Sequence, residues 1–226
     1  MKRALVEATH KTEEKVETYY TWRASNYDAG AGFEVEHHLE AIRLADVHAG
    51  QRVLDVACGT GRATIGLANA VGLQGRLDAL DLTEAMLAKA RAKIEKNGMT
   101  DRVYFKQGNA KELPYPDKSF DLVYNGYMFD LIPLDGFLPI LKEFYRVLKP
   151  GGKVVLVNMS KPDEHQTFYE TIYAKGWAVM PCRPVLMGSY LEQTGFKDIH
   201  RLYRPTRGFI VSWLWGTEII TANSDA

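Results

Sequence analysis

The sequence has little cysteine, no net charge and no long apolar run. Cys58 and Cys182 are its two cysteines, too few for a disulfide framework or a metal cluster. Basic and acidic residues number 28 each, so no overall positive field is present to hold nucleic acid or an anionic membrane. No apolar stretch has the length to span a bilayer. The start, MKRALVEATHKTEEK, also lacks the apolar core of a secretory signal.

These absences predict a cytoplasmic protein with no metal site, no nucleic-acid partner and no stable membrane insertion. One local basic group, Arg201, Arg204 and Arg207, is better explained as a solvated face beside a strand than as a binding patch. The composition is 46% hydrophobic and 25% charged, as in ordinary globular proteins. A chain of 226 residues suits one α/β domain with a small cap, working as a monomer or homodimer.

Strand and helix signals alternate between residues 34 and 159. Apolar periodicity predicts helices over 34–48, 62–71 and 136–148, and Thr83 is placed to cap a further helix that runs through Asn97. Short apolar runs predict strands at 52–57, 76–81, 102–107, 120–125 and 153–159. This rhythm indicates a doubly wound, Rossmann-like α/β sheet whose strands are mostly parallel.

The last part of the chain breaks the rhythm. Residues 163–180 are aromatic and irregular, and 187–194 favour a helix. Two further strands, 197–204 and 208–215, are separated by only two or three residues around 205–207, which is typical of a hairpin. The prediction is therefore seven strands with an antiparallel C-terminal hairpin strand. We expect an N-terminal helical cap at 1–48 and a cap insertion at 160–186, both within a single domain, 1–226.

The segment DVACGTGR at 55–62 carries the strongest ligand signal. A glycine turn between a strand and a helix lets a ligand approach the backbone. Thr64 stands where a dinucleotide fingerprint requires its third glycine, which disfavours NAD. The carboxylate of Asp55 would repel a pyrophosphate, but it suits the ammonium and sulfonium of S-adenosylmethionine. The alternative is that Asp55 only shapes the turn.

Two more polar residues follow strand ends. Asp81 closes the second predicted strand, twenty residues after Gly61, where an acid hydrogen-bonds ribose hydroxyls in these folds. Asn109 follows the third strand and is placed to meet an adenine edge; the alternative is a turn residue that makes local hydrogen bonds.

The segments VLDVACGTGR, ALDLTEAML, QGNAKELPYPDKSFDLVYN and EFYRVLKPGGKVVLVNM resemble successive motifs of class I S-adenosylmethionine-dependent methyltransferases. The UbiE/COQ5-like branch is the most similar, strongly over residues 50–160 and more weakly over 187–216. The resemblance implies that Asp55, Gly59 and Gly61 hold the methionine end, and that Leu82 and Ala110 flank adenine. It places Asn125 at the methyl-donating centre. The full implied set of cofactor-binding residues is Tyr27, Asp55, Ala57, Gly59, Thr60, Gly61, Asp81, Leu82, Met86, Gly108, Asn109, Ala110 and Asn125.

The substrate side departs from the family pattern. Tyr127, Met128, Phe129 and Asp130 stand where many relatives carry a His pair, and 160–186 match nothing familiar. In-line methyl transfer needs a general base only when the acceptor must lose a proton. The candidates are Tyr127, Asp130, His165 and His37, and the sequence singles out none. Cys58 is expected to pack, because the family has small residues at that position.

Surplus aromatic residues lie near the N-terminus and after the fifth strand. They either line a pocket for a partly apolar or amine-bearing acceptor or fix the cap to the domain. Three other functions are kept as alternatives: an aminopropyl-transferring enzyme on the same adenosyl site, an NAD-dependent oxidoreductase, and a non-catalytic S-adenosylmethionine-binding subunit. The aromatic residues concerned are Tyr19, Tyr20, Trp22, Tyr27, Phe168, Tyr169, Tyr173 and Trp177.

Overall fold

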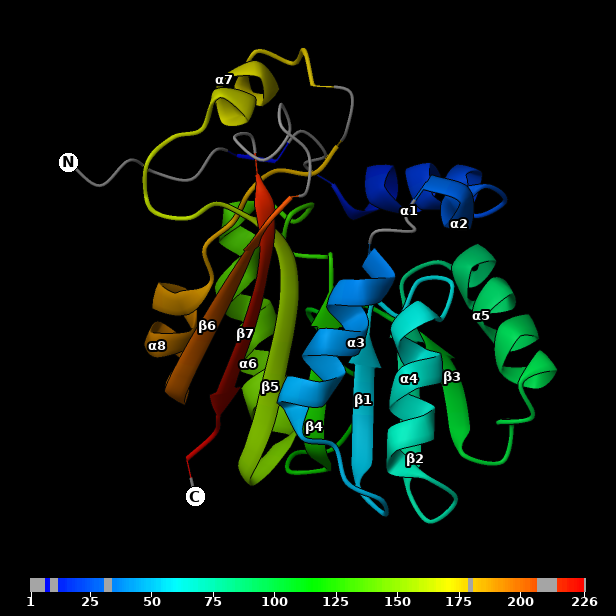
Figure 1. The fold of residues 1–226 in the computed structure, drawn as a ribbon. Helices are drawn as coiled ribbons and strands as arrows, with labels where there is room; N and C mark the ends of the chain where they lie inside the picture. The colour runs from blue at the N-terminus through cyan, green and yellow to red at the C-terminus, as the bar shows by residue number, and fades with distance from the viewer. Residues whose placement is uncertain (1–6, 9–11, 31–33, 179–180, 207–214, 226) are drawn as a thin grey trace.

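A seven-stranded sheet in the order β3-β2-β1-β4-β5-β7-β6 forms the centre of the molecule (Figure 1). The computed structural model describes residues 7–8, 12–30, 34–178, 181–206 and 215–225. All neighbouring strands run parallel except β7, which is antiparallel to both β5 and β6. The predicted fold class is therefore confirmed. The strands are β1 Arg52–Val56, β2 Arg76–Asp81, β3 Val103–Gln107, β4 Phe120–Gly126, β5 Leu148–Ser160, β6 Lys197–Pro205 and β7 Gly216–Asn223.

Helices cover both faces of the sheet because the central strands are apolar on both sides. Three helices, α3 (Glu34–Ala45), α4 (Arg62–Val71) and α5 (Glu84–Lys96), bury their apolar residues on one face. On the other face, α6 (Phe137–Val147) and α8 (Gly188–Thr194) enclose a second apolar core with a short 3-10 turn, η1 (Leu134–Gly136), ahead of α6. Because β1 to β5 run parallel, their carboxyl ends meet at the same edge of the sheet.

The C-terminal hairpin is confirmed in its strand direction but not in its turn. Pro205 pairs with Gly216, so the predicted turn at 205–207 is in the wrong place. Most of the predicted strand 208–215 lies outside the described residues; the strand that pairs with β5 is 216–223. The sequence pattern did not indicate a buried strand at 216–223, because it contains Glu218 and a buried acid is rare in strands. The side chain is fully buried and is paired with Arg201 at 2.5 Å.

Three short helices lie beyond the carboxyl ends of the parallel strands: α1 (Glu13–Arg23), α2 (Tyr27–Gly30) and α7 (Phe168–Ala174) (Figure 1). The prediction of irregular structure at 163–180 missed α7. Thr167 begins that helix with a capping box that includes Glu170. Glu170 also forms a buried ion pair with Lys161 at 2.7 Å, and this contact attaches α7 to the end of β5.

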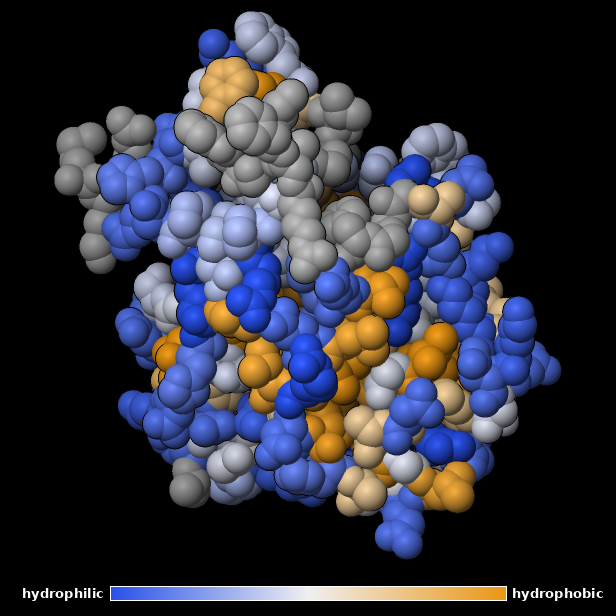
Figure 2. Space-filling view, viewed as in Figure 1, coloured by the Kyte–Doolittle hydropathy of each residue, from blue (hydrophilic) through white to orange (hydrophobic). Residues whose placement is uncertain are grey.

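Apolar side chains remain exposed on the outer face of α3. Val35, Leu39 and Leu44 are 45%, 55% and 44% exposed, and Figure 2 shows hydrophobic surface gathered over this helix. None of the helices in the described ranges combines the length and the apolar character required to cross a membrane.

Candidate functional site

The loop after β1 has the backbone geometry that the glycine pattern predicted. Gly59 and Gly61 have φ of 55° and 82°, values that favour glycine. An added Cβ on Gly61 would lie 3.1 Å from the Ala90 Cβ of α5, so this glycine lets the loop pack against the helix. A Cβ on Gly59 would meet nothing within 4 Å, and Gly59 lines open space beside the loop.

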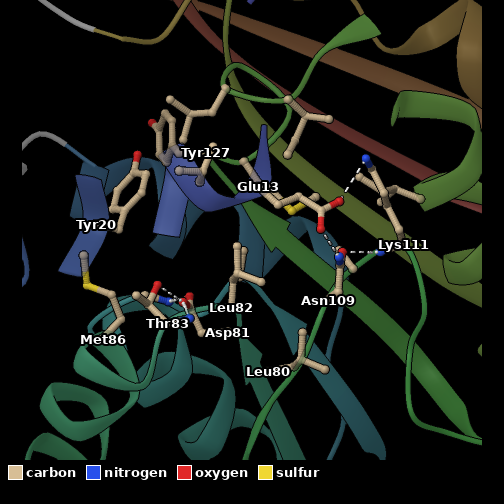
Figure 3. Close-up of a pocket in the computed structure, with 18 of the residues that line it drawn as sticks. Glu13, Tyr20, Leu80, Asp81, Leu82, Thr83, Met86, Asn109, Lys111 and Tyr127 are labelled. Carbon is tan, nitrogen blue, oxygen red and sulfur yellow. Dashed lines mark hydrogen bonds and ion pairs between the residues drawn. The ribbon is translucent and has the colours of Figure 1, made fainter. Parts of the chain in front are cut away.

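A mostly apolar cavity opens at the carboxyl ends of β1, β2 and β4 (Figure 3). Residues between Thr12 and Ile140 contribute to it, including parts of α1, the glycine loop and the start of α6. Its lining consists of Thr12, Glu13, Val16, Tyr20, Tyr27, Ala57, Gly59, Leu80, Asp81, Leu82, Thr83, Met86, Gly108, Asn109, Ala110, Lys111, Gly126, Tyr127, Met128, Leu131, Ile132, Pro133 and Ile140.

Asp81 links the glycine loop to the start of α5. One carboxylate oxygen accepts a hydrogen bond from the Gly59 N–H at 2.8 Å. The other accepts from the N–H and the hydroxyl of Thr83, both at 2.9 Å. Burial raises the pKa of Asp81, and these donors act against that shift. The carboxylate is thus fixed at the cavity wall, where a ligand's hydroxyls can reach it.

Helix α1 reaches the opposite wall through Glu13 (Figure 3). The Asn109 side-chain amide donates to Glu13 at 2.7 Å, and the Lys111 Nζ lies 3.0 Å from the other Glu13 oxygen. The side-chain Oδ1 of Asn109 accepts a hydrogen bond from the Lys111 backbone N–H at 2.9 Å. Asn109 therefore makes the local hydrogen bond of a turn residue, which was the alternative to a role in binding adenine. Its side-chain amide also contacts Glu13 of α1 at the cavity wall.

A second, more polar cavity adjoins the first and shares five of its residues. The shared residues are Tyr27, Ala57, Gly59, Gly126 and Tyr127. The residues found only in the second cavity are Glu34, His38, Asp55, Cys58, Thr60, Arg62, Ala63 and Tyr124.

Two buried acids, Asp55 and Glu34, make the second cavity polar. Burial raises the pKa of Asp55 to about 7, although the Thr64 hydroxyl donates to it at 2.7 Å. Burial also raises the pKa of Glu34 to about 7, with the Arg62 guanidinium 3.6 Å away acting in the opposite direction. A cationic group that entered this cavity would draw both acids into their ionised forms.

Helix α2 is attached to the glycine loop by Asp28. Its carboxylate accepts from the Thr60 hydroxyl at 2.6 Å and from the Arg62 Nε at 3.0 Å, and it pairs with the Lys93 Nζ at 2.6 Å. Burial opposes ionisation of Asp28, but the hydrogen bonds from Lys93, Thr60 and Arg62 outweigh it and lower its pKa to about 2. The ring of Tyr27 faces the same guanidinium.

Eleven of the thirteen predicted cofactor residues line one cavity or both. Gly61 and Asn125 line neither: Gly61 packs on α5, and the Asn125 amide donates to the Val56 carbonyl at 2.8 Å across β4 and β1. Their roles, like those of the other eleven, stay predictions. The residues in the first cavity are Tyr27, Ala57, Gly59, Asp81, Leu82, Met86, Gly108, Asn109 and Ala110, and the second adds Asp55 and Thr60.

The catalytic candidates lie in different places. Tyr127 lines both cavities, and its hydroxyl lies 2.9 Å from His37 Nδ1 and 3.2 Å from the Thr217 hydroxyl. Asp130 is buried just after β4. His165 has an 89% exposed side chain, binds Asp163 and lines neither cavity.

Several cavity residues escaped the sequence reasoning. Glu13 and Glu34 lie in the N-terminal segment, where no motif marks a position, and they reach the site only through folding. Arg62 and Lys111 lie inside the segments DVACGTGR and QGNAKELPYPDKSFDLVYN, next to the predicted Gly61 and Ala110, but the sequence analysis gave neither of them a role in the site.

This strand order, with a glycine loop after β1 and an acid at the end of β2, defines the Rossmann-like class I methyltransferases that use S-adenosylmethionine. Within that class, the chain belongs to the ubiE/COQ5 methyltransferase family, whose model matches residues 9–197. The resemblance seen in the sequence is thereby confirmed.

Individual relatives agree with this assignment. A demethylmenaquinone methyltransferase of Bacillus cytotoxicus is 39% identical over 155 residues, which cover 66% of this chain and 64% of the relative. The match thus spans under two thirds of that relative's length.

Solved structures share the fold at low sequence identity. The [4+2]-cyclase SpnF has a TM-score of 0.75 at 20% identity, covering 99% of this chain and 100% of its own. A Haemonchus contortus phosphoethanolamine N-methyltransferase 2, solved in complex with S-adenosyl-L-methionine, has a TM-score of 0.67 at 19% identity and covers 84% of this chain and 53% of its own. At such identities these likenesses establish the fold alone.

Proposed function

We propose that the chain transfers a methyl group from S-adenosylmethionine to a small, partly apolar acceptor by in-line displacement. The observation that carries this proposal is the pair of adjoining cavities. One is mostly apolar with a fixed carboxylate, and the other holds buried acids and an arginine. S-adenosylmethionine has two matching parts: an adenosyl group that suits the apolar cavity, and a charged amino-acid group that suits the polar one.

The residues present fit this cofactor. Leu82, Met86 and Ala110 would hold adenine, and Asp81 would accept hydrogen bonds from the ribose hydroxyls. Asp55 would hold the ammonium of the methionine end, since it is an acid in the second cavity. When bound, the cofactor supplies an electrophilic methyl group on a good leaving group. The protein's part is to align the acceptor with that methyl and to exclude water.

The acceptor space is proposed to be the apolar end of the first cavity. Val16, Tyr20, Leu131, Ile132 and Ile140 line it, which suits an apolar ring better than a polyamine. The name of the Bacillus relatives, demethylmenaquinone methyltransferase, supports a ring acceptor for this chain. The aminopropyl-transfer alternative is disfavoured, because a polyamine would need several acids in the Asn125–Asp130 stretch and the sequence supplies one.

We also propose that residues 1–48 and 160–186 act as caps on one domain. Their parts α1, α2 and α7 stand beyond the strand ends, where ligands enter such sheets. The proposed setting is the cytoplasm, with the chain acting as a monomer or homodimer on a small molecule. Its zero net charge supports a substrate other than nucleic acid.

A methyl-transfer assay tests the function. The protein is incubated with methyl-labelled S-adenosylmethionine and a panel of quinols, phenols and amines, and the products are identified by mass spectrometry. We expect label in a ring acceptor together with an equal amount of S-adenosylhomocysteine. Tight cofactor binding without label in any acceptor would favour a non-methylating adenosyl enzyme or a binding subunit.

A further inference from the structure

His38 of α3 lies in the wall of the second cavity, and one of its ring nitrogens is already bound. The residue is buried, and its Nδ1 lies 2.7 Å from the Tyr124 hydroxyl of β4. Its ring also meets the ring of Tyr127 edge to face, with centroids 5.5 Å apart and planes at 89°. These two contacts fix the plane of the imidazole, so the direction of its second nitrogen is set by the fold.

The Tyr124 hydroxyl decides which nitrogen of His38 carries the proton. Tyr124 is fully buried, and burial holds its pKa well above its usual range, so the hydroxyl keeps its proton. Among the described residues, His38 Nδ1 is the hydrogen-bond partner of that hydroxyl. A proton on Nδ1 would leave the buried O–H without an acceptor, which is costly. Burial also lowers the pKa of His38 to about 4, so the ring is neutral and its single proton lies on Nε2.

The Nε2–H group of His38 is accessible from the second cavity. An added Cβ on Gly126, which lines both cavities, would lie 2.6 Å from His38 Cε1, the ring atom bonded to Nε2. Within the described part of the chain, Nε2 has no hydrogen-bond partner, yet it is not one of the unpartnered atoms that are closed off from solvent. Since His38 lines the second cavity, this cavity is the open space that its free donor meets.

Two other donors of the same cavity are bound within the protein. The Thr60 hydroxyl and the Arg62 Nε donate to the Asp28 carboxylate at 2.6 and 3.0 Å. A further nitrogen of the Arg62 guanidinium donates to the Asp28 carbonyl at 2.7 Å, and the guanidinium also faces Glu34 at 3.6 Å. The charge of Arg62 is therefore balanced by two acids, whereas the His38 Nε2–H is left for a ligand.

We propose that His38 binds the carboxylate of the cofactor's amino-acid end through its Nε2–H. This inference rests on the proposed methyl transfer and concerns how the same site selects its ligand. The amino-acid end carries an ammonium and a carboxylate. Asp55 suits the first and repels the second, so the carboxylate needs a donor from another element. A neutral imidazole supplies that donor without adding a cation that would pair with Glu34.

Tyr124 is then a positioning residue, because it donates to Nδ1 and so keeps the proton of His38 on Nε2. The second cavity would thereby distinguish a complete amino-acid end from one that has lost its carboxylate.

The test compares S-adenosylmethionine with decarboxylated S-adenosylmethionine, which keeps the ammonium and the sulfonium but lacks the carboxylate. The main variant is His38→Asn, since the asparagine Oδ1 replaces Nδ1 as acceptor for Tyr124 while the donor at Nε2 is lost. In calorimetry the wild type should bind S-adenosylmethionine more tightly, and this preference should fall about tenfold in His38→Asn. His38→Gln, whose amide nitrogen reaches the place of Nε2, should recover part of it. The matched control His48→Asn, with a side chain 65% exposed, should keep the full preference.

A second measurement tests the tautomer without any ligand. NMR of protein labelled with nitrogen-15 histidine should show His38 protonated at Nε2, and Tyr124→Phe should weaken that selection. A His38 protonated at Nδ1 would overturn the inference, and so would a His38→Asn variant with the wild-type preference; in both cases the methyl-transfer function would still stand. A wild type that binds neither compound would refute the proposed function, and this inference with it.

Discussion

Cofactor affinity should depend on pH through Asp55, and the structure gives the size of the effect. The pKa of this buried carboxyl is raised to about 7. Only its ionised form attracts the ammonium of the methionine end. The ionised fraction is about 0.9 at pH 8 and about 0.1 at pH 6, so the affinity should fall about tenfold, or about 1.4 kcal/mol, between them. The sign follows from the raised pKa: binding is strongest above pH 7 and is lost as the pH falls through it.

The assay is titration calorimetry with S-adenosylhomocysteine and with methylthioadenosine at both pH values. Methylthioadenosine lacks the amino-acid end, so Asp55 should contribute nothing to its pH dependence. Asp55→Asn should weaken binding of S-adenosylhomocysteine at pH 8 and flatten its pH dependence. The asparagine carbonyl can still accept the Thr64 hydroxyl, so the loop should keep its shape.

Glu34 requires its own control, because it lines the same cavity and its pKa is also raised to about 7 by burial. In Glu34→Gln, the affinity for S-adenosylhomocysteine should still depend on pH through the titration of Asp55. If Asp55→Asn retains the full pH dependence, or if it weakens both ligands equally, Asp55 shapes the loop and does not bind the ammonium.

Further predictions concern the cofactor and the caps. Calorimetry should give micromolar affinity for S-adenosylmethionine, about −7 to −8 kcal/mol, and no measurable binding of NAD. Asp81→Ala should weaken the binding of S-adenosylhomocysteine by about 1–3 kcal/mol, because the ribose hydroxyls lose their hydrogen-bond acceptor. Unchanged affinity would show that Asp81 is not part of the site. Hydrogen exchange should slow together at 12–30 and 160–178 when S-adenosylhomocysteine binds, as expected for a lid; protection already present without ligand would contradict this. Tyr27→Ala should reduce turnover more than thermal stability, and mainly unfolding would mean that Tyr27 is fixed structure.

Much of the fold follows from local patterns in the sequence. The strands 52–56 and 76–81 are short apolar runs that the folded protein buries on both sides, and Gly59 and Gly61 mark the turn that joins β1 to α4. The distance along the chain from this turn to Asp81 reflects one complete crossover from strand to strand. Such features depend on neighbours in sequence, so one sequence is enough to predict them.

The contacts that close the site depend on distant residues and could not be predicted in this way. Glu13 meets Asn109 across 96 residues, and Asp28 meets Lys93 from another element. No periodicity encodes these pairs. The end of the sheet shows the same limit. The buried Glu218 is stabilised by an ion pair with Arg201 and by hydrogen bonds from the Met187 N–H and the Ser160 hydroxyl, and these partners are brought together only by folding.

The account's central claim is that one cofactor molecule occupies both cavities, and a crystal structure with S-adenosylhomocysteine tests it most directly. We predict adenine beside Leu82 and Met86, the ribose hydroxyls on Asp81, and the amino-acid end in the cavity that contains Asp55 and Glu34. The sulfur would then lie at the shared wall near Tyr127. A ligand bound elsewhere, or one whose amino-acid end points away from Asp55, would contradict the claim.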